Sequence, residues 1–253
     1  MLLSLITATS AFADASGQPA GITEEAGDMH NLYLLVLGMA LVVFVLVEAA
    51  LIFIIFRFRK QSDALPPQTH GNNALEIIWT SIPIVIVLIL FVFSFVVLVR
   101  VDDKAKAEDL TVEVQGFQFC WSFTYHLNDL GRGGDKNATG NVVETQPNCE
   151  AVEPVLVIPV NEPVEFKLKS TDVIHSFYVR DFLYKLDVVP GRDNSFQVTA
   201  NETGTFEGQC AELCGANHAL MRFRLRVVER SEFDTFISER AAASKAAAAA
   251  VKD

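Results

Sequence analysis

Five side chains that can bind a soft metal ion are the most informative feature of this sequence. Cys210, Cys214, His218 and Met221 lie in one short segment, and His175 lies upstream of it. Thiolate, thioether and imidazole groups together favour copper, whereas magnesium and calcium prefer oxygen ligands. Two thiolates, two imidazoles and one thioether also exceed what a tetrahedral zinc ion needs, and methionine is not a usual zinc ligand. The segment therefore predicts two copper ions that share the two cysteine sulfurs, in a centre that carries electrons.

A simpler interpretation of Cys210 and Cys214 is a disulfide, with the nearby histidine and methionine present by chance. A disulfide at this spacing does not explain why His218 and Met221 follow, so the metal interpretation is preferred. The other two cysteines, Cys120 and Cys149, lie in a region that we expect to be exported, where an exposed free thiol is a liability. The sequence leaves a disulfide between these two residues open.

Two long apolar runs, about Leu32–Phe56 and Ile77–Val99, must place the metal segment at a membrane. Each run exceeds the roughly 20 apolar residues that cross the hydrocarbon core of a bilayer. Their length and their few charges disfavour buried helices of a soluble core. We therefore predict that residues 32–100 form a two-helix transmembrane hairpin with a cytoplasmic loop.

Basic residues in the connecting loop set the orientation of this hairpin. Arg57, Arg59 and Lys60 follow the first run, and such residues prefer the cytoplasmic side of short loops. The first span then runs inward, the second runs outward, and everything after Arg100 lies outside. Residues 1–13 end in a small-x-small pattern typical of signal-peptide cleavage, although they lack a basic start, and an uncleaved tail is the alternative. An exported segment at residues 14–31, with a polar linker into the first helix at residues 14–30, agrees with this topology and with a bacterial plasma membrane.

Beyond Arg100 the sequence changes to short alternating segments that are typical of β-strands. The expected strands cover residues 110–115, 118–125, 154–159, 164–169, 175–179, 195–199, 204–207 and 222–228. Short strands separated by turn residues favour an antiparallel sandwich or a Greek-key barrel, here over residues 101–230. Residues 128–148 are expected to form a long polar excursion. Residues 231–253 are expected to form a short helix, at 232–240, and an Ala-rich tail outside the fold.

The expected exported part is also the acidic part of the chain. Residues 101–253 carry 24 acidic and 16 basic side chains, and the whole chain has a net charge of −11. Such a field attracts a basic partner and repels nucleic acid. Solubility alone is the competing explanation, and charge by itself does not separate the two.

Three segments together resemble subunit 2 of cytochrome c oxidase, and the resemblance extends over nearly the whole chain. They are His175-Ser-Phe-Tyr-Val, Lys185-Leu-Asp-Val-Val-Pro-Gly-Arg192 and Gly208-Gln-Cys-Ala-Glu-Leu-Cys-Gly-Ala-Asn-His-Ala-Leu-Met221. The resemblance implies a two-helix transmembrane hairpin followed by an all-β cupredoxin-like Greek-key sandwich with a dinuclear copper A centre. It implies that both cysteines bridge the two coppers and that His175 and His218 each bind one of them. Met221 and the backbone carbonyl of Glu212 are then the axial ligands.

The same resemblance implies roles for two carboxylates. The Glu212 side chain is expected to reach a magnesium or manganese ion at the interface with subunit 1. Glu76 matches a glutamate at the entrance of a proton path, although an ordinary interfacial carboxylate costs little at that depth. Glu48, near the middle of the first span, is expected to face a neighbouring helix, with no specific role.

An aromatic segment departs from the family pattern. The family has Trp-Tyr-Trp where this chain has Phe119-Cys120-Trp121, and the first of those tryptophans is where cytochrome c delivers electrons. Either electrons enter by Trp121 or Tyr125, or the donor is not a soluble cytochrome c. A role in the sandwich core is the default for such aromatics. Asp172 matches an acidic residue implicated in donor docking, and a solvated loop acid is the alternative.

The resemblance implies the electron-transfer subunit of a membrane oxidase, with subunit 1, other oxidase subunits and cytochrome c as partners. Oxygen reduction and proton translocation then belong to the haem-bearing subunit 1, and no residue of this chain is catalytic. A membrane-anchored copper-binding or copper-delivery protein is the alternative. Delivery proteins need exposed, exchangeable ligands, whereas this motif supplies a full set. A quinol oxidase subunit is set aside, because those subunits lack the copper ligands.

Overall fold

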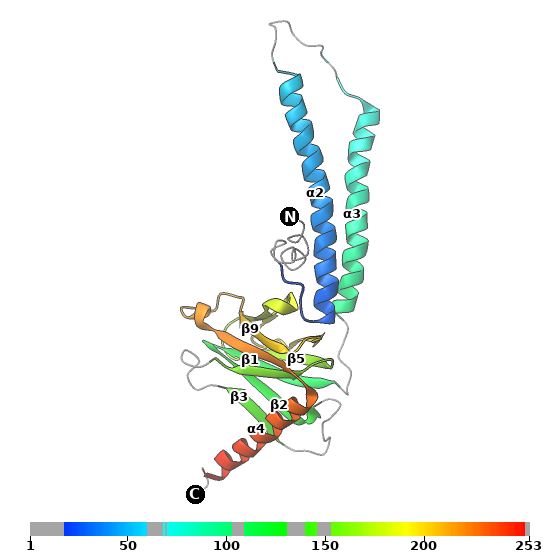
Figure 1. The fold of residues 1–253 in the computed structure, drawn as a ribbon. Helices are drawn as coiled ribbons and strands as arrows, with labels where there is room; N and C mark the ends of the chain where they lie inside the picture. The colour runs from blue at the N-terminus through cyan, green and yellow to red at the C-terminus, as the bar shows by residue number, and fades with distance from the viewer. Residues whose placement is uncertain are drawn as a thin grey trace, which may run out of the picture. The chain divides into compact units, whose positions relative to one another are not determined.

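The computed structural model describes residues 18–59, 68, 70–102, 109–130, 140–145 and 153–250 (Figure 1). Two compact units make up the chain. The β-sheet unit combines Met1–His30 with Arg100–Asp253, and the helical unit is Asn31–Val99. The predicted signal peptide, residues 1–13, lies outside the described residues.

Two long helices account for the apolar runs. α2 spans Glu24–Arg57 and α3 spans Asn73–Val101, so each is longer than a bilayer crossing requires. Their apolar side chains are exposed instead of packed in a core, and Phe56, for example, is 70% exposed. Asn72 caps α3, because its side-chain oxygen accepts hydrogen bonds from two backbone N–H groups of the first turn. Apolar helices without protein cover in the described part of the chain suit a lipid environment.

Residues 18–30 before the first span belong to the β-sheet unit, which corrects the prediction of a polar linker over residues 14–30 for the described part of that range. Ile22 belongs to the core of that unit, and Thr23 forms a β-bridge with Ala200. The Thr23 hydroxyl also accepts a hydrogen bond from the backbone N–H of Ala26 at 3.0 Å. This N-cap starts α2 before the apolar run begins.

Two five-stranded sheets form the rest of the β-sheet unit within the described residues. The strands are β1 (Leu110–Phe117), β2 (Cys120–Leu130), β3 (Asn141–Thr145), β4 (Val155–Pro159), β5 (Pro163–Ser170), β6 (His175–Val179), β7 (Tyr184–Val188), β8 (Asn194–Thr199), β9 (Gly204–Cys210) and β10 (Arg222–Val228). One sheet has the order β3-β2-β1-β5-β8, and the other has the order β4-β10-β9-β6-β7. The two-sheet sandwich expected from the alternating segments is confirmed.

The pairing is mixed, which corrects the expectation of a purely antiparallel sandwich. β1 pairs with β5 in parallel, and β4 pairs with β10 in parallel. After β3 the chain crosses to β4 in the second sheet and returns to β5 in the first. Parallel neighbours need such a crossover, because a tight hairpin can only join antiparallel strands.

Aromatic rings from both sheets meet in the core. Phe223 of β10 lies 4.9 Å from Phe177, 5.3 Å from Phe123 and 5.7 Å from Trp121 between ring centroids. All four side chains are essentially fully buried. These rings hold the two sheets together, at the end of the sandwich where β6 starts and β9 stops.

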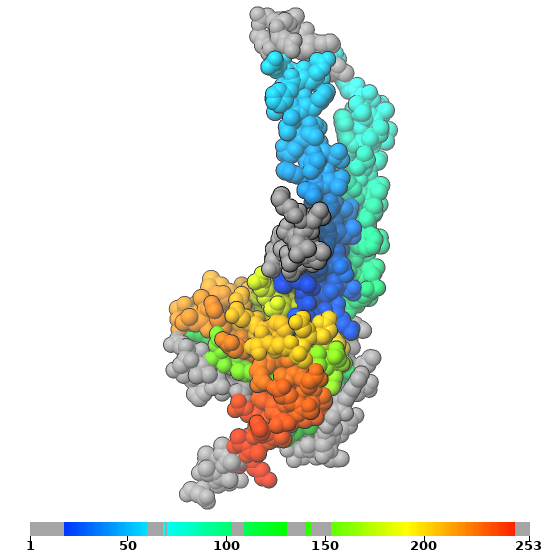
Figure 2. Space-filling view, in the orientation of Figure 1, coloured from blue at the N-terminus to red at the C-terminus, as the bar shows by residue number. Residues whose placement is uncertain are grey.

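Three local predictions were wrong. β2 continues to Leu130 and β3 lies within residues 128–148, where we expected only a polar excursion. β7, which was not predicted, pairs with β6. The last helix, α4, spans Arg230–Ala250, and its residues 242–245 are exposed (Figures 1 and 2). Alanine has the highest helix propensity, and burial of Phe233 and Ile237 anchors the first turns, so the helix continues into the Ala-rich segment.

Candidate metal centre

Neighbouring strands of one sheet bring the predicted sulfur and imidazole side chains together. His175 is the first residue of β6, and Cys210 is the last residue of β9, which pairs with β6. We call residues 210–221 the metal loop; it includes the short 3-10 helix η3 (His218–Leu220). The backbone N–H of Cys210 donates to the Met221 carbonyl at 2.9 Å, which closes the loop at its base.

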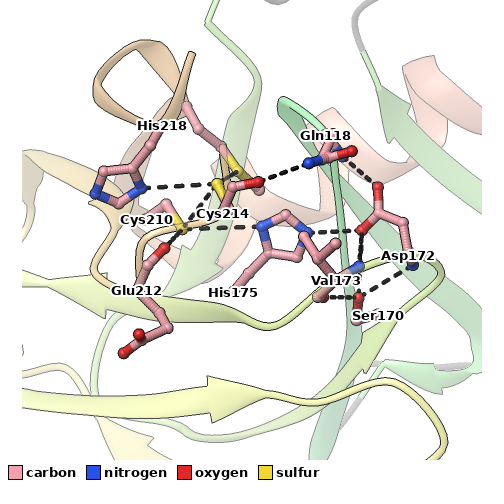
Figure 3. A network of polar contacts seen from close by, with 10 residues as sticks. Gln118, Ser170, Asp172, Val173, His175, Cys210, Glu212, Cys214 and His218 are labelled. Atoms are coloured by element: carbon pink, nitrogen blue, oxygen red, sulfur yellow. Dashed lines mark hydrogen bonds and ion pairs between the residues drawn. The ribbon is translucent and has the colours of Figure 1, made fainter. Parts of the chain in front are cut away.

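The donor atoms lie close together. Cys210 Sγ and Cys214 Sγ are 3.9 Å apart, and the Met221 thioether lies 3.8 Å from Cys214 Sγ. His175 Nδ1 lies 3.9 Å from Cys210 Sγ, and His218 Nδ1 lies 3.6 Å from Cys214 Sγ. Figure 3 shows the two imidazoles on opposite sides of the sulfurs. Each ring therefore turns the same nitrogen, Nδ1, towards a different cysteine.

These distances fit a metal centre and exclude a disulfide. A tetrahedral metal bound about 2.3 Å from sulfur sets its ligand atoms roughly 3.8 Å apart. A disulfide would hold the two sulfurs about 2.05 Å apart, whereas Cys210 and Cys214 are free thiols. His175, Cys210 and Cys214 form a group that could hold a metal ion. With two sulfurs between two imidazoles, the donor set is suited to two soft ions.

The donors are largely removed from water. His175 is fully buried, Met221 is 1% exposed, and Cys210 and Cys214 are 4% and 5% exposed. His218 is only half-buried. Three exposed apolar side chains lie in the ligand segments or next to them, namely Ile174, Leu213 and Leu220. A metal held here would have little contact with solvent except near His218.

In the metal-free protein the pKa values of the two thiols are shifted in opposite directions. Burial raises the pKa of Cys210, but contacts with His175 and with backbone groups of Glu212 and Ser176 outweigh burial and lower it. Burial and the nearby charge of Cys210 raise the pKa of Cys214. Cys210 is therefore the readier thiolate. Metal binding must displace the proton from Cys214, because only thiolates are strong ligands.

Asp172 orients the His175 ring. Its Oδ1 lies 2.8 Å from His175 Nε2, on the side of the ring away from the sulfurs. The same carboxylate accepts hydrogen bonds from the backbone N–H of Gln118, at 2.6 Å, and from that of Val173, also at 2.6 Å. An acceptor at Nε2 favours the tautomer with the proton on that nitrogen and leaves Nδ1 free to bind a metal.

We expect Asp172→Asn to destabilise the metal-free protein in a pH-dependent way. Burial raises the pKa of Asp172, but hydrogen bonds from His175, Gln118 and Val173 outweigh burial and lower it. A carboxyl whose folded pKa lies below its unfolded value of about 3.9 stabilises the fold above that value. The stabilisation is lost as the pH falls through the folded pKa. The wild type should therefore exceed the variant in unfolding free energy down to about pH 4 and lose that advantage below it.

Urea unfolding of the copper-free chain at a series of pH values measures this difference. Asp193→Asn, a change to an exposed carboxyl elsewhere in the same unit, is the matched control. If the difference in unfolding free energy between the wild type and Asp172→Asn stayed constant below about pH 4, the prediction would be contradicted.

The aromatic candidates occupy three different places. Trp121 is fully buried, 6.1 Å from the His175 ring between centroids, and its indole N–H points to the Met221 carbonyl at 3.5 Å. Phe119 is half-buried and packs beside the metal loop, because a Cβ added to Gly215 would lie 3.0 Å from its ring. Both aromatics therefore adjoin segments that carry the donor atoms.

Tyr125 lies in the core, in contact with α4. Its hydroxyl donates to the Val157 carbonyl at 3.0 Å and accepts from the Val157 N–H at 2.8 Å. Its ring packs against Phe233 and Phe236 of α4. This position gives Tyr125 a packing role and does not support it as a place where electrons enter.

The predicted carboxylates stand apart from the donor cluster. The Glu212 carbonyl lies 3.3 Å from Cys210 Sγ, and its exposed side chain points away from the sulfurs (Figure 3). Glu76 is in the first turn of α3, where it lines a shallow surface pocket with Asn73, Ile77, Thr80 and Ser81. Glu48 is exposed along α2.

Two residues of the β1–β2 hairpin were missed by the sequence reasoning. The Gln118 side chain donates to the Cys214 carbonyl at 2.6 Å. Gly116 lies against the His175 ring, so closely that a Cβ would come within 3.1 Å of it. The only feature of the sequence that could have indicated these two residues is their position just before the segment Phe119-Cys120-Trp121. Cys120 in the same hairpin is disulfide-bonded, and its predicted partner, Cys149, lies outside the described residues, so that pairing stays a prediction.

Comparison with known proteins gives the family. Residues 110–228 match the model of the cytochrome c oxidase subunit II periplasmic domain, and residues 7–97 match that of the subunit II transmembrane domain. A probable cytochrome c oxidase subunit 2 of Streptomyces avermitilis is 36% identical, over 88% of this chain and 78% of that protein. One from Rickettsia bellii is 36% identical, over 87% of this chain and 80% of that protein.

A solved structure is also similar to part of the chain. The periplasmic domain of subunit II of cytochrome oxidase from Bradyrhizobium japonicum is 35% identical, with a TM-score of 0.44. It covers 54% of this chain, and the match covers 95% of that chain. The family models confirm the two-span membrane protein with its C-terminal domain on the periplasmic side. This chain belongs to the cytochrome c oxidase subunit II family.

Proposed function

We propose that this chain accepts electrons from a cytochrome c outside the membrane at a copper A centre. It then passes them to haem in subunit 1 of a cytochrome c oxidase, where oxygen is reduced and protons are translocated. The observation that carries this proposal is the cluster of two free thiols between two imidazoles, each presenting Nδ1 to a different sulfur. Membership of the subunit II family supports the identity of the metal as copper.

The ligand roles follow from the donor positions. Cys210 and Cys214 would be shared by the two ions, because their sulfurs are central and 3.9 Å apart. His175 and His218 would each hold one ion from opposite sides. Met221 lies near Cys214 and the Glu212 carbonyl lies near Cys210, so these two groups would complete the ligand set. When bound, the copper pair supplies a one-electron carrier whose charge is shared between two metals.

The protein keeps these ligands in place between redox states. The closed base of the metal loop, the Asp172 contact with His175 and the buried aromatic core all restrict movement of the donor atoms. Burial also excludes water, which would otherwise reorganise when the charge changes. A rigid, dry site suits electron transfer and does not suit metal delivery, which needs exposed and exchangeable ligands.

Electrons are proposed to enter at the Phe119–Trp121 corner. Phe119 packs against the metal loop nearer the surface, and Trp121 lies between the core and the His175 and Met221 segments. Asp172 is partly exposed beside them and is placed to contribute to donor docking as well as to orient His175. The acidic charge of this part of the chain supports a basic donor.

Two further roles are proposed for carboxylates. The Glu212 side chain points away from the sulfurs and is free to bind a magnesium or manganese ion whose other ligands come from subunit 1. Glu76 begins α3 on the cytoplasmic side of the second span, where nearby Asn73 and Thr80 line the same surface pocket. That polar position supports proton uptake into subunit 1 by way of Glu76.

Electron paramagnetic resonance of the full chain, purified from membranes with copper, tests the proposal. We expect hyperfine splitting by two equivalent copper nuclei and co-purification of a haem-bearing partner. Splitting by a single copper nucleus would refute the shared centre. A copper-loaded chain that is always isolated alone would favour a copper-binding protein without an oxidase partner.

A further inference from the structure

We propose that Gln118 is a positioning residue for the metal centre, through contacts with both segments that supply its ligands. The inference rests on the proposed roles of Cys214 and His175 as copper ligands. Gln118 lies in the turn between β1 and β2, on the sheet opposite the one that carries the ligands. Its side chain and its backbone are hydrogen-bonded in two different directions (Figure 3).

The side chain of Gln118 holds the metal loop. Its Nε2 donates to the Cys214 carbonyl at 2.6 Å. The carbonyl belongs to the same residue as the bridging sulfur, so its direction limits the directions open to Cys214 Sγ. The Gln118 residue is otherwise exposed, which means that this contact is not required to satisfy a buried amide.

Gly215 allows the turn and the loop to approach each other. Its φ is +136°, in the region that favours glycine, and a Cβ there would lie 3.0 Å from both Gln118 Nε2 and the Phe119 ring. Such a contact is tighter than most Cβ contacts, so the neighbouring side chains would have to move by a few tenths of an ångström. The missing side chain at Gly215 is therefore what lets the Gln118 amide reach the neighbouring carbonyl.

The backbone of Gln118 holds the other ligand segment. Its N–H donates to Asp172 Oδ2 at 2.6 Å, and Asp172 Oδ1 contacts His175 Nε2 at 2.8 Å. One residue thus connects His175 on β6 with Cys214 on the metal loop. Because both contacts start from the same turn, a shift of the turn moves a terminal ligand and a bridging ligand together. Gln118 therefore holds the Cys214 segment in place relative to His175.

The test separates the side-chain contact from the backbone contact. Gln118→Met keeps the length of the side chain and the backbone N–H but removes the amide donor. Gln118→Glu keeps the length but directs a carboxylate at the Cys214 carbonyl. Gln115→Met is the matched control, because Gln115 lies three residues earlier in β1, on the opposite face from the buried Val114 and Gly116.

We expect the full-length Gln118→Met chain to bind copper about 10-fold more weakly than wild type. We also expect unequal hyperfine coupling to the two copper nuclei and a shifted reduction potential. Gln118→Glu should show larger changes in the same three measurements, and Gln115→Met should match wild type. Unfolding of the copper-free chains, followed by tryptophan fluorescence, checks that the variants are folded.

Wild-type properties for both Gln118 variants, or equal changes in the Gln115 control, would overturn the inference. A Gln118→Glu chain that resembles wild type more than Gln118→Met does would also overturn it, because the amide donor would then be irrelevant. Failure of the copper assignment itself is recognised separately, since the wild-type chain would then lack the signal of a copper pair.

Discussion

Replacing Cys214 with serine is expected to abolish electron transfer from cytochrome c, with a fall of more than about 100-fold in oxygen consumption. Cys214 Sγ lies within 3.9 Å of Cys210 Sγ, His218 Nδ1 and the Met221 thioether. Three of the other proposed ligand side chains therefore lie next to this sulfur. A serine hydroxyl is a hard, largely protonated oxygen at neutral pH and does not bridge two soft ions.

The measurement is oxygen uptake by the purified oxidase with reduced cytochrome c, together with copper and haem content. We expect haem to stay and the signal of the copper pair to vanish. Ala216→Ser is the matched control, because it adds a hydroxyl to an exposed position of the same loop. Normal activity in Cys214→Ser would contradict the proposed bridging role, and a loss equal in the control would point to a general effect on the loop.

Replacing Phe223 with alanine is expected to have the largest effect on stability, about 3–5 kcal/mol. The ring is 1% exposed and lies within 5.7 Å of three other aromatic rings from both sheets. Its removal leaves a cavity between the sheets, and the surrounding buried rings can relax into it only in part. Because a domain is stabilised by only about 5–15 kcal/mol, the loss is a large fraction of the total.

Gly208, directly opposite Phe223 on β9, provides a coupled test. A Cβ built on Gly208 would lie 2.1 Å from the Phe223 ring, so Gly208→Ala alone should destabilise the fold by about 1–3 kcal/mol or more. In the Phe223→Ala background the ring is gone, and the same change should cost much less. The two changes should therefore be strongly non-additive.

Urea unfolding of the β-sheet unit in the full chain measures the four combinations. The chain has two tryptophans, Trp79 and Trp121, so Trp79→Phe leaves Trp121 in the core as the single reporter. Leu220→Ala, at an exposed site on the metal loop, should change the unfolding free energy little. Additive effects of Gly208→Ala and Phe223→Ala would contradict the packing between them.

The donor set and the membrane anchor could be predicted from sequence because their signals are local. The metal loop carries Cys210 to Met221 in one turn-rich segment, and the apolar runs are long enough to require helices whatever they pack against. The same local logic misjudged residues 241–250, which are helical. Burial of Phe233 anchors the start of α4, and the high helix propensity of alanine extends it. The low complexity of the Ala-rich segment therefore does not indicate a lack of structure.

Contacts between distant segments were not predictable in this way. The place of Tyr125 in an aromatic segment suggests electron transfer, whereas its ring packs against α4, which is far away in the sequence. Residues 14–30 read as a linker because nothing near them in the chain indicates that Ile22 packs in the sandwich. The parallel pairing of β1 with β5 likewise depends on which sheet β4 joins.

The sequence by itself determined the ligand types, their order in the metal loop, the two spans and the side of the membrane. Side-chain chemistry and hydropathy are properties of each residue, so they can be evaluated without knowing the fold. Only the tertiary structure decided that Asp172 faces His175 Nε2 and that Gln118 reaches the Cys214 carbonyl. The Asp172 contact depends on the conformation of the segment between β5 and β6. The Gln118 contact joins a turn of one sheet to a loop of the other, so it depends on how the two sheets pack.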